Sequence, residues 1–288
     1  PLPPSQLAAL TSSQAAALGA SNIAAMTETQ AAALTTTQIG QLSTDAARAF
    51  EASHVAAMST TQVRALTATQ FAALETTDIG DFTQTQIAAL TASQIQAFSS
   101  DNFAALSDAQ VAALTASQIA AVSTTNIAAM ADTQMSALTT TQLAALSTAQ
   151  VRALSETNLS LLDQTQIGAL SSAHMAALTS TQLEALSAAD MAEFRTTQIA
   201  ALTATQIRNL SETNVTDLAA TQVAALTATQ IQAFTATNFS ALTDTQVSAL
   251  STSQIAALNT TQIGALDESD IAEFAATQIA ALTSTQLN

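Results

Sequence analysis

Residues Leu226–Leu250 read LTATQIQAFTATNFSALTDTQVSAL, which separates into three versions of one eight-residue unit: TATQIQAF, TATNFSAL and TDTQVSAL. From Thr11 to Leu282 this register never slips, and 34 octads follow one another without insertion or deletion. Their consensus is Ser/Thr, any residue, Ser/Thr, Gln, an apolar residue, any residue, Ala, and Leu, Phe or Met. Loops between packed elements normally vary in length. The constant register therefore predicts one continuous octapeptide-repeat solenoid over residues 1–288.

Positions one and four of the octad predict the start of a helix. Ser or Thr followed three residues later by Gln has the spacing of a capping box, in which each side chain bonds a backbone N–H of the other residue. Thr227–Gln230 contains this box, and Leu226 and Ile231 occupy the places of a hydrophobic staple around it. Apolar positions five and eight lie on one helix face. We expect one short helix per octad in an all-α solenoid, stabilised by stacking because so short a helix is unstable alone.

A β-solenoid is the alternative fold. Thr, Ile and Val suit strands, whereas abundant Ala and Gln do not, and five Gly are few for the tight corners of such a fold. One uninterrupted α-helix is a weaker hypothesis, because eight residues turn through about 800°. Its apolar surface would wind around every side of the helix, and nothing would bury it.

Departures from the consensus Gln follow a slower period. With Ala46 and His54 counted as one event and His174 set aside, successive departures fall three or four octads apart. The average is about 28 residues, a period typical of repeat architectures. Some departures recur every seven octads, which is twice this period; these are Ala46, Asn102, Asn158, Asn214 and Asp270. We infer that about 3.5 repeats form one superhelical turn and that one side of the solenoid differs from the rest. Turns stacked about 8–10 Å apart would then form a rod on the order of 100 Å long.

Composition excludes several classes of function. The net charge is −16, Lys is absent, and the five Arg are isolated in the sequence, so phosphate-rich nucleic acid and anionic membranes are poor partners. No apolar run is long enough to span a membrane. Cys is absent, which excludes disulfides and thiolate metal sites. The chain begins with PLPP and ends within a repeat, so we interpret it as a processed product or a segment of a longer array.

Three octads combine extra acids with Phe and are the only candidates for a metal site. They read DIGDF, DMAEF and DIAEF, and their paired carboxylates are Asp78 and Asp81, Asp190 and Glu193, and Asp270 and Glu273. Clustered carboxylates attract Ca²⁺, which takes six to eight oxygen ligands. Two acids do not complete such a site. The hypothesis is a weak divalent-cation or lateral docking site, and the simpler interpretation is a solvated acidic edge.

No residue pattern predicts an enzyme or a cofactor. His54 and His174 stand at the Gln position, far apart in the sequence and without metal-ligand spacing, so we interpret them as capping substitutes. The many Ser and Thr lack a His and acid arranged for nucleophilic catalysis. A phosphate-binding Gly-rich loop is also absent. We expect a non-enzymatic protein with no cofactor.

Units such as ALTTTQI at residues 33–39 resemble the tandem repeats of very large bacterial surface or secreted proteins of the adhesin-like type. This resemblance in repeat style implies a structural protein, an extracellular or cell-surface rod, stalk or filament, whose partner is another copy of itself, end to end or side by side. The alternative is a binding or adhesion module that uses one side of the solenoid for self-association, a cation or a surface ligand. The Thr-x-Thr pattern also resembles the threonine ranks of insect-type ice-binding β-solenoids, and ice binding is a further alternative.

Overall fold

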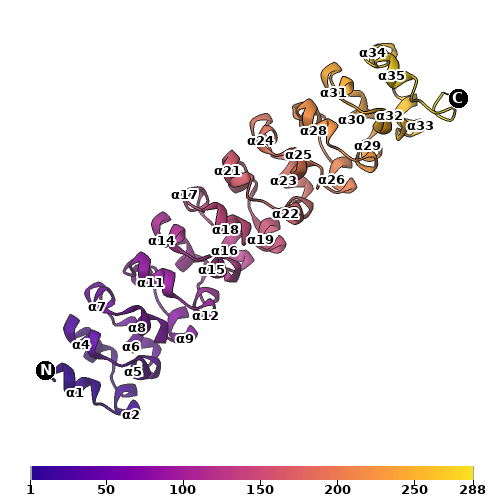
Figure 1. Cartoon of the computed structure of the whole chain (residues 1–288). Helices are drawn as coiled ribbons and strands as arrows, with labels where there is room; N and C mark the ends of the chain where they lie inside the picture. Colours follow the sequence, from indigo (N-terminus) through magenta and orange to yellow (C-terminus); the bar gives the residue numbers. More distant parts are fainter. Residues whose placement is uncertain (1, 288) are drawn as a thin grey trace. The chain divides into compact units, whose positions relative to one another are not determined.

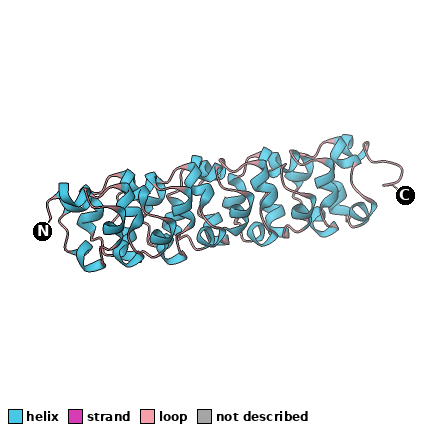
Figure 2. Ribbon diagram, turned by 90° about the horizontal axis from the view of Figure 1, so that it is seen from below, coloured by secondary structure: helices cyan, strands magenta, loops and turns pink. Residues whose placement is uncertain are grey.

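A computed structural model of the chain describes residues 2–287. Within this range it contains 35 α-helices of four to six residues and no strand. Figure 2 accordingly shows only helices and loops. The prediction of an all-α solenoid with one short helix per octad is confirmed, and the β-solenoid alternative is wrong. The flat strand array on which threonine ranks depend is absent from the described residues.

The chain divides into two compact units, Pro1–Leu146 and Ser147–Asn288. The octad register continues through this boundary, because Leu146 closes one octad and Ser147 opens the next. Figure 1 labels the helices along the chain. A single continuous array across both units stays a prediction from the sequence.

The helices of the first unit recur at eight-residue intervals. They are α1 (Pro4–Ala8), α2 (Ser12–Ala16), α3 (Ala20–Ala24), α4 (Glu28–Ala33), α5 (Thr36–Gln41), α6 (Thr44–Arg48), α7 (Ala52–Ala57), α8 (Thr60–Ala65), α9 (Ala68–Ala72), α10 (Thr76–Gly80), α11 (Gln84–Ala89), α12 (Ala92–Gln96), α13 (Ser100–Ala104), α14 (Asp108–Ala113), α15 (Ala116–Ala121), α16 (Thr124–Ala128), α17 (Asp132–Ser136) and α18 (Thr140–Ala144).

The helices of the second unit keep the same interval. They are α19 (Thr148–Ala153), α20 (Glu156–Ser160), α21 (Gln164–Ile167), α22 (Ser172–Ala177), α23 (Ser180–Glu184), α24 (Ala188–Glu193), α25 (Thr196–Ile199), α26 (Ala204–Arg208), α27 (Glu212–Asp217), α28 (Ala220–Ala224), α29 (Ala228–Ala233), α30 (Ala236–Ser240), α31 (Asp244–Ser248), α32 (Thr252–Ala256), α33 (Thr260–Gly264), α34 (Glu268–Ala272) and α35 (Ala276–Ile279).

The octad around α29 shows how each helix begins and ends. Thr227 is its N-cap, and its hydroxyl accepts from the N–H of Gln230 at 3.2 Å. In return the N–H of Thr227 donates to Oε1 of Gln230 at 2.7 Å, which completes the predicted capping box. Phe234 ends the helix in an extended conformation, with φ −55° and ψ 139°. No residue from 2 to 287 has a positive φ, so the chain turns its corners without Gly.

From Gln30 onward, the Gln at position four of the octad has a second structural role, which spans one whole turn of the solenoid. Nε2 of Gln230 donates to the carbonyl of Leu202, 28 residues earlier, at 2.7 Å, and to that of Ala200 at 3.1 Å. Gln94 makes the same kind of bonds to Leu66 and Val63 in the first unit. We call these bonds across 28 residues the Gln ladder. This spacing equals three and a half octads, so the ladder confirms the inferred superhelical turn.

Helices three places apart pack against one another. Helix α29 contacts both α26 and α32, and α11 contacts α8 and α14. Each helix therefore packs against its neighbours in the preceding and following turns, within the same unit. Since an isolated helix of five residues is unstable, these contacts and the Gln ladder hold the helices in place.

Positions five and eight form the core, as predicted. Side chains at position five, such as Ile95 and Phe71, are fully buried, and those at position eight are nearly so. The following turn provides this cover: Ile271 and Ile279, over which no later turn lies, are 49% and 38% exposed. Apolar burial between turns therefore accounts for most of the attraction within the stack.

Positions six and seven of the octad lie in different environments. At position six, Ala72 and its equivalents lie exposed on the surface. Position seven, represented by Ala73, is half-buried. Position six points outward because it is adjacent to the buried position five on the helix. Successive residues of an α-helix lie about 100° apart around its axis, so the residue after a buried position five faces a different side of the helix.

Candidate functional site

The acidic octads contain the helices α10, α24 and α34, and in each the ladder Gln is replaced by Asp. These helices stack on others that carry Asn instead of Gln: α10 contacts α13, and α24 contacts α27. The departures from consensus therefore lie above one another within each unit. This arrangement agrees with the inference that one side of the solenoid differs from the rest.

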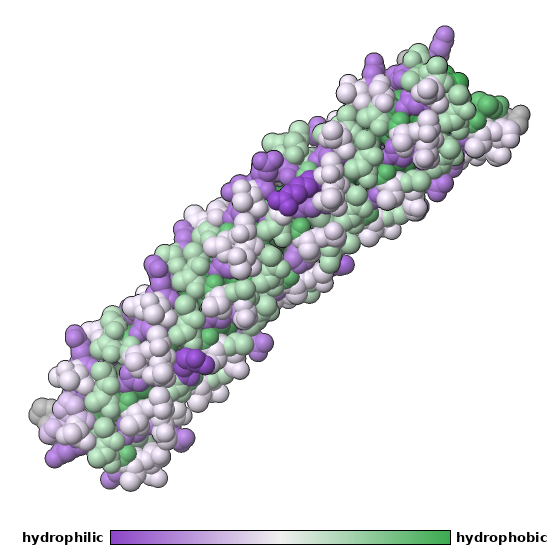
Figure 3. All heavy atoms as spheres, in the orientation of Figure 1, coloured by the Kyte–Doolittle hydropathy of each residue, from purple (hydrophilic) through white to green (hydrophobic). Residues whose placement is uncertain are grey.

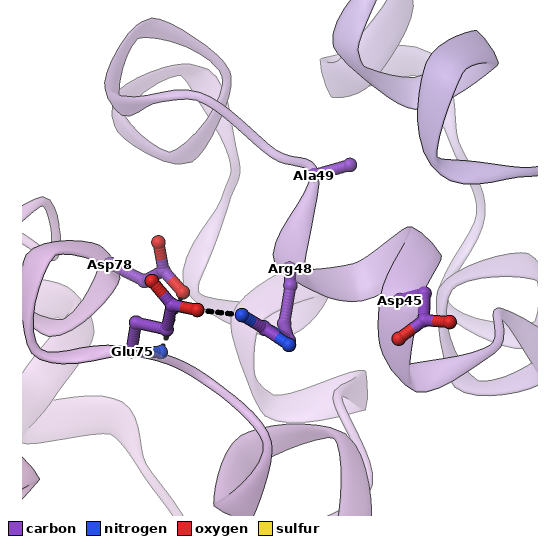
Figure 4. A pocket seen from close by; sticks show the side chains of 5 residues that line it. All are labelled: Asp45, Arg48, Ala49, Glu75 and Asp78. Atoms are coloured by element: carbon purple, nitrogen blue, oxygen red, sulfur yellow. Dashed lines mark hydrogen bonds and ion pairs between the residues drawn. The ribbon is translucent and has the colours of Figure 1, made fainter.

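The first acidic octad lies beside an open hollow lined by Asp45, Arg48, Ala49, Glu75 and Asp78. Figure 4 shows Arg48 of α6 pointing toward Glu75, with which it forms an ion pair, and Asp78 beside Glu75. Arg48 and Glu75 are 39% and 61% exposed, so water screens this pair. The hollow holds three acids and one cation, and its net charge is negative.

Burial raises the pKa of the Asp78 carboxyl, although the Arg48 guanidinium opposes this by favouring the ionised form. The N–H of Glu75 donates to Oδ2 of Asp78 at 2.7 Å, so Asp78 caps its own helix. Burial also raises the pKa of Asp81, and the nearby negative charge of Asp78 adds to the shift. The predicted pair of carboxylates is thus close enough to interact electrostatically.

The second acidic octad brings together Asp190, Glu193 and Asp163. Burial raises the pKa of Glu193, and the charges of Asp190 and Asp163 raise it further. One oxygen of Glu193, Oε2, is buried and has no hydrogen-bond partner. Asp163, the N-cap of α21, accepts from the N–H of Gln166 at 2.8 Å.

The third acidic octad contains the most strongly raised pKa, that of Glu273. The pKa of Glu273 is raised to about 7 by burial, by a hydrogen bond and a like charge from Asp244, and by the charges of Asp270 and Asp267. Oδ2 of Asp270 accepts from the Ser240 hydroxyl at 2.7 Å and from the N–H of Asp267 at 2.9 Å. The carboxyl groups of Glu273 and Asp244, which come from adjacent turns, therefore lie close enough to form a hydrogen bond when one of them is protonated.

Sequence reasoning identified the six paired carboxylates but missed their neighbours from the preceding turn. Arg48, Asp163 and Asp244 precede their partners Asp78, Glu193 and Glu273 by about one turn of the ladder. The period of this turn was visible in the sequence. Searching for charges one period apart would have found them.

The described residues contain no group of three or more His, Cys, Asp or Glu side chains placed to hold a metal ion. The paired carboxylates of each octad have one or two further acids near them, without the six to eight oxygen ligands of a Ca²⁺ site. The cation-binding hypothesis therefore stays a prediction. In the same part of the chain, none of the helices has the length and apolar character needed to cross a membrane.

Both His residues act as capping substitutes, as predicted. Nδ1 of His54 accepts from the N–H of Glu51 at 3.1 Å, and its Nε2 lies 2.7 Å from the carbonyl of Met26, 28 residues earlier. A neutral imidazole with its proton on Nε2 satisfies both contacts. Nδ1 of His174 likewise accepts from the N–H of Ser171 at 3.3 Å. His54 thus replaces Gln in the cap and in the ladder.

The helices, caps and ladder define a helical repeat protein of the solenoid type. Its surface in Figure 3 shows mainly small residues of intermediate hydropathy with scattered hydrophilic side chains. Residues 71–108 and 136–172 match the ALTTAQ repeat family, so the chain contains tandem ALTTAQ repeats. A comparison with curated proteins finds no match to this chain.

Proposed function

We propose that the chain is a non-enzymatic structural protein that serves as a rigid rod, stalk or filament outside the cell or at its surface. The observation that carries this proposal is the Gln ladder. The amide of each ladder Gln both caps its own helix and binds the preceding turn, so its polar atoms serve the scaffold. A side chain engaged in this way is not free to bind a substrate.

The regular turns of the solenoid favour a rod in particular among these structural roles. The main contacts between helices join those three places apart along the chain, which is the contact pattern of repeat proteins that grow in one dimension. Adding octads to such a protein changes its length and leaves its cross-section unchanged. Acidic, Lys-free composition keeps such a rod soluble at high local concentration.

Small-angle X-ray scattering of the chain and of a deletion variant tests this function. Deleting residues 43–98 removes seven octads, which are two whole turns, and joins Leu42 to Ser99 in register. The variant is expected to keep its helical circular dichroism and its cross-section while its maximum dimension falls by about 20 Å. Deleting residues 43–74 is the matched control, because it removes four octads and leaves the turns out of phase. A compact particle, or a cross-section that changes with the seven-octad deletion, contradicts the proposal.

Self-association, end to end or side by side, and an extracellular location belong to the same proposal. Sedimentation velocity over a range of concentrations is expected to show a growing species. Antibody labelling of intact source cells is expected to reach the chain. A strictly monomeric chain rejects the filament, and labelling only after lysis rejects the location.

A second candidate function is a binding module that uses the acidic octads. The hollow lined by Asp45, Arg48, Glu75 and Asp78 favours it, because its charge is negative and it opens to solvent. Calorimetric titration with Ca²⁺ tests this candidate. Heat that is present with the native chain and lost in the Asp78→Gln, Asp190→Gln and Asp270→Gln triple variant would support it. No heat with the native chain would reject it.

A further inference from the structure

Three turns of the Gln ladder lack their donor. In a Gln octad the side-chain amide donates to the position-eight carbonyl 28 residues earlier. In the acidic octads an ionised Asp stands at this place and cannot donate. Each carbonyl opposite the Asp accepts no hydrogen bond from any described residue. The Asp and carbonyl pairs are Asp78 with Phe50, Asp190 with Leu162, and Asp270 with Leu242.

One oxygen of each of these Asp side chains is already used. Oδ2 accepts from the N–H of the helix N-cap in all three octads, and the donors are Glu75 at 2.7 Å, Ser187 at 2.8 Å and Asp267 at 2.9 Å. Oδ1 has no hydrogen bond in any of them among the described residues. The unused oxygen is therefore the one available for the preceding turn.

Asn at the same position shows what this second atom does when it can donate. Nδ2 of Asn102 donates to the carbonyl of Leu74, 28 residues earlier, at 2.8 Å. Asn214 makes both bonds at once, since its Oδ1 accepts from the N–H of Ser211 at 3.4 Å and its Nδ2 donates to the carbonyl of Leu186 at 3.2 Å. A protonated Asp has the shape of Asn and carries one O–H donor. A protonated Asp at this position could make the same bond.

We propose that the three acidic octads are proton-operated links of the ladder, closed when the carboxyl at position four is protonated and open when it is ionised. In the closed state Oδ1–H donates to the carbonyl of the preceding turn, as Nδ2 of Asn does. In the open state both atoms are acceptors, and the link makes no hydrogen bond between Oδ1 and the carbonyl of the preceding turn. The stability of the solenoid against unfolding consequently increases as the pH falls.

The groups around the first link include some that raise the pKa of its carboxyl and some that lower it. Around the first link, burial raises the pKa of Asp78, and Arg48 opposes that shift. The groups on the elements near this link are Asp45 and Arg48 on α6, Glu51 and His54 at α7, Glu75 and Asp81 on either side of α10, and Asp101 on α13. Acids outnumber cations there, which favours proton uptake.

The links of the second unit have acidic surroundings. Oε2 of Glu193 is buried without a partner, so this side chain also gains a hydrogen-bonding capacity when protonated. The groups near the second link are Glu156 on α20, Asp163 capping α21, Glu193 and Arg195 at the end of α24, and Glu212 and Asp217 on α27; those near the third are Asp244 on α31 and Asp267, Glu268 and Glu273 at α34.

These shifts fix the sign of the pH dependence. A carboxyl whose pKa is raised by folding binds more protons in the folded chain than in the unfolded chain. Its contribution to stability is complete below its unfolded pKa and is lost as the pH rises through its folded pKa. Burial gives the first link, Asp78, such a raised pKa, and for Glu273, beside the third link, the window runs from 4.5 to about 7. The stack is therefore expected to loosen between mildly acidic and neutral pH.

Thermal unfolding followed by circular dichroism from pH 8 to pH 5 tests the proposal. The midpoint of the native chain is expected to rise by about 5 °C on acidification. The Asp78→Asn, Asp190→Asn and Asp270→Asn triple variant should have a higher midpoint than the native chain at pH 8. On acidification its midpoint should rise by at most half as much as that of the native chain. The Glu28→Gln, Asp108→Asn and Asp132→Asn variant is the matched control, because it removes three exposed charges that face no orphan carbonyl. It should keep the native rise.

The converse variant, Asn102→Asp, should create a fourth link. Its stability is expected to fall below that of the native chain at pH 8 and to return to it at pH 5. An unfolding midpoint of the native chain that does not change with pH would overturn the proposal. Water that bridges the two oxygens would produce this result, because the link would then not depend on a proton. Equal pH dependence in the native chain and the triple Asn variant would also overturn it, and so would an Asn102→Asp variant equally destabilised at pH 8 and pH 5.

Discussion

Replacing Gln94 with Glu tests the Gln ladder directly. Gln94 is 1% exposed, and its Oε1 accepts from the N–H of Thr91 at 2.8 Å. Its Nε2 donates to the carbonyls of Val63 and Leu66, both at 2.9 Å. Glu has the same shape and keeps an oxygen for the cap. It lacks the donor, so the substitution removes the ladder bonds and leaves the helix start in place.

The structure sets the size of the effect. The Leu66 carbonyl has no other donor among the described residues and is left buried and unpaired, which costs about 1–3 kcal/mol. The carboxylate is also removed from water beside this carbonyl, which adds to the cost. We expect a loss of about 3 kcal/mol in the free energy of unfolding at pH 7, and less at pH 5. Gln94→Asn should lose only about 1 kcal/mol, since Asn102 still reaches its carbonyl at 2.8 Å.

Chemical denaturation measures these losses, and hydrogen exchange of the peptides covering residues 59–66 and 91–98 places them in the chain. Gln96→Ala is the matched control, because Gln96 is the same residue type two positions away and is exposed. Its effect should stay within about 0.5 kcal/mol. If Gln94→Glu is as stable as this control at pH 7, the ladder contributes little and the reasoning fails.

Three further predictions concern the core, a cap and an ion pair. Ile95→Ala should lower the free energy of unfolding by about 2–5 kcal/mol, whereas Ile279→Ala, at a partly exposed position, should lose less than about 1 kcal/mol in the same denaturation assay. Ala219→Thr should stabilise the chain by about 0.5–1 kcal/mol, because Ala219 is an N-cap without a side-chain hydrogen bond; an unchanged midpoint would show that the ladder alone defines that helix start. Arg48→Ala should raise the pKa of Asp78 further, measured by carboxyl NMR, because the guanidinium that opposes the shift is gone; a lowered pKa would contradict this.

The octad alone was enough to predict the fold class. The spacing of Thr227 and Gln230 predicts a capping box, and the structure has that box at 2.7 and 3.2 Å. The interval between Asn102 and Asn158 predicts a turn of 28 residues, and the ladder spans 28 residues. These features are local or periodic, so the order of residues along the chain is enough to predict them.

Features that depend on the neighbouring turn were not predictable in the same way. The sequence could not tell that position six faces solvent, since Ala suits either environment. It also could not tell that Oε2 of Glu193 is buried without a partner, because the cover over a side chain depends on how the helices pack.

The sequence by itself determined that each octad starts a short helix, that its apolar residues lie on one face, and that a turn takes three and a half octads. Capping and periodicity act within a few residues, so the order of residues is sufficient for them. Only the tertiary structure decided that the Gln amide binds the preceding turn and that Asp at the same place leaves a carbonyl without a donor. A hydrogen bond of this kind depends on the distance between atoms in different turns, and that distance is set by the packing of the whole stack.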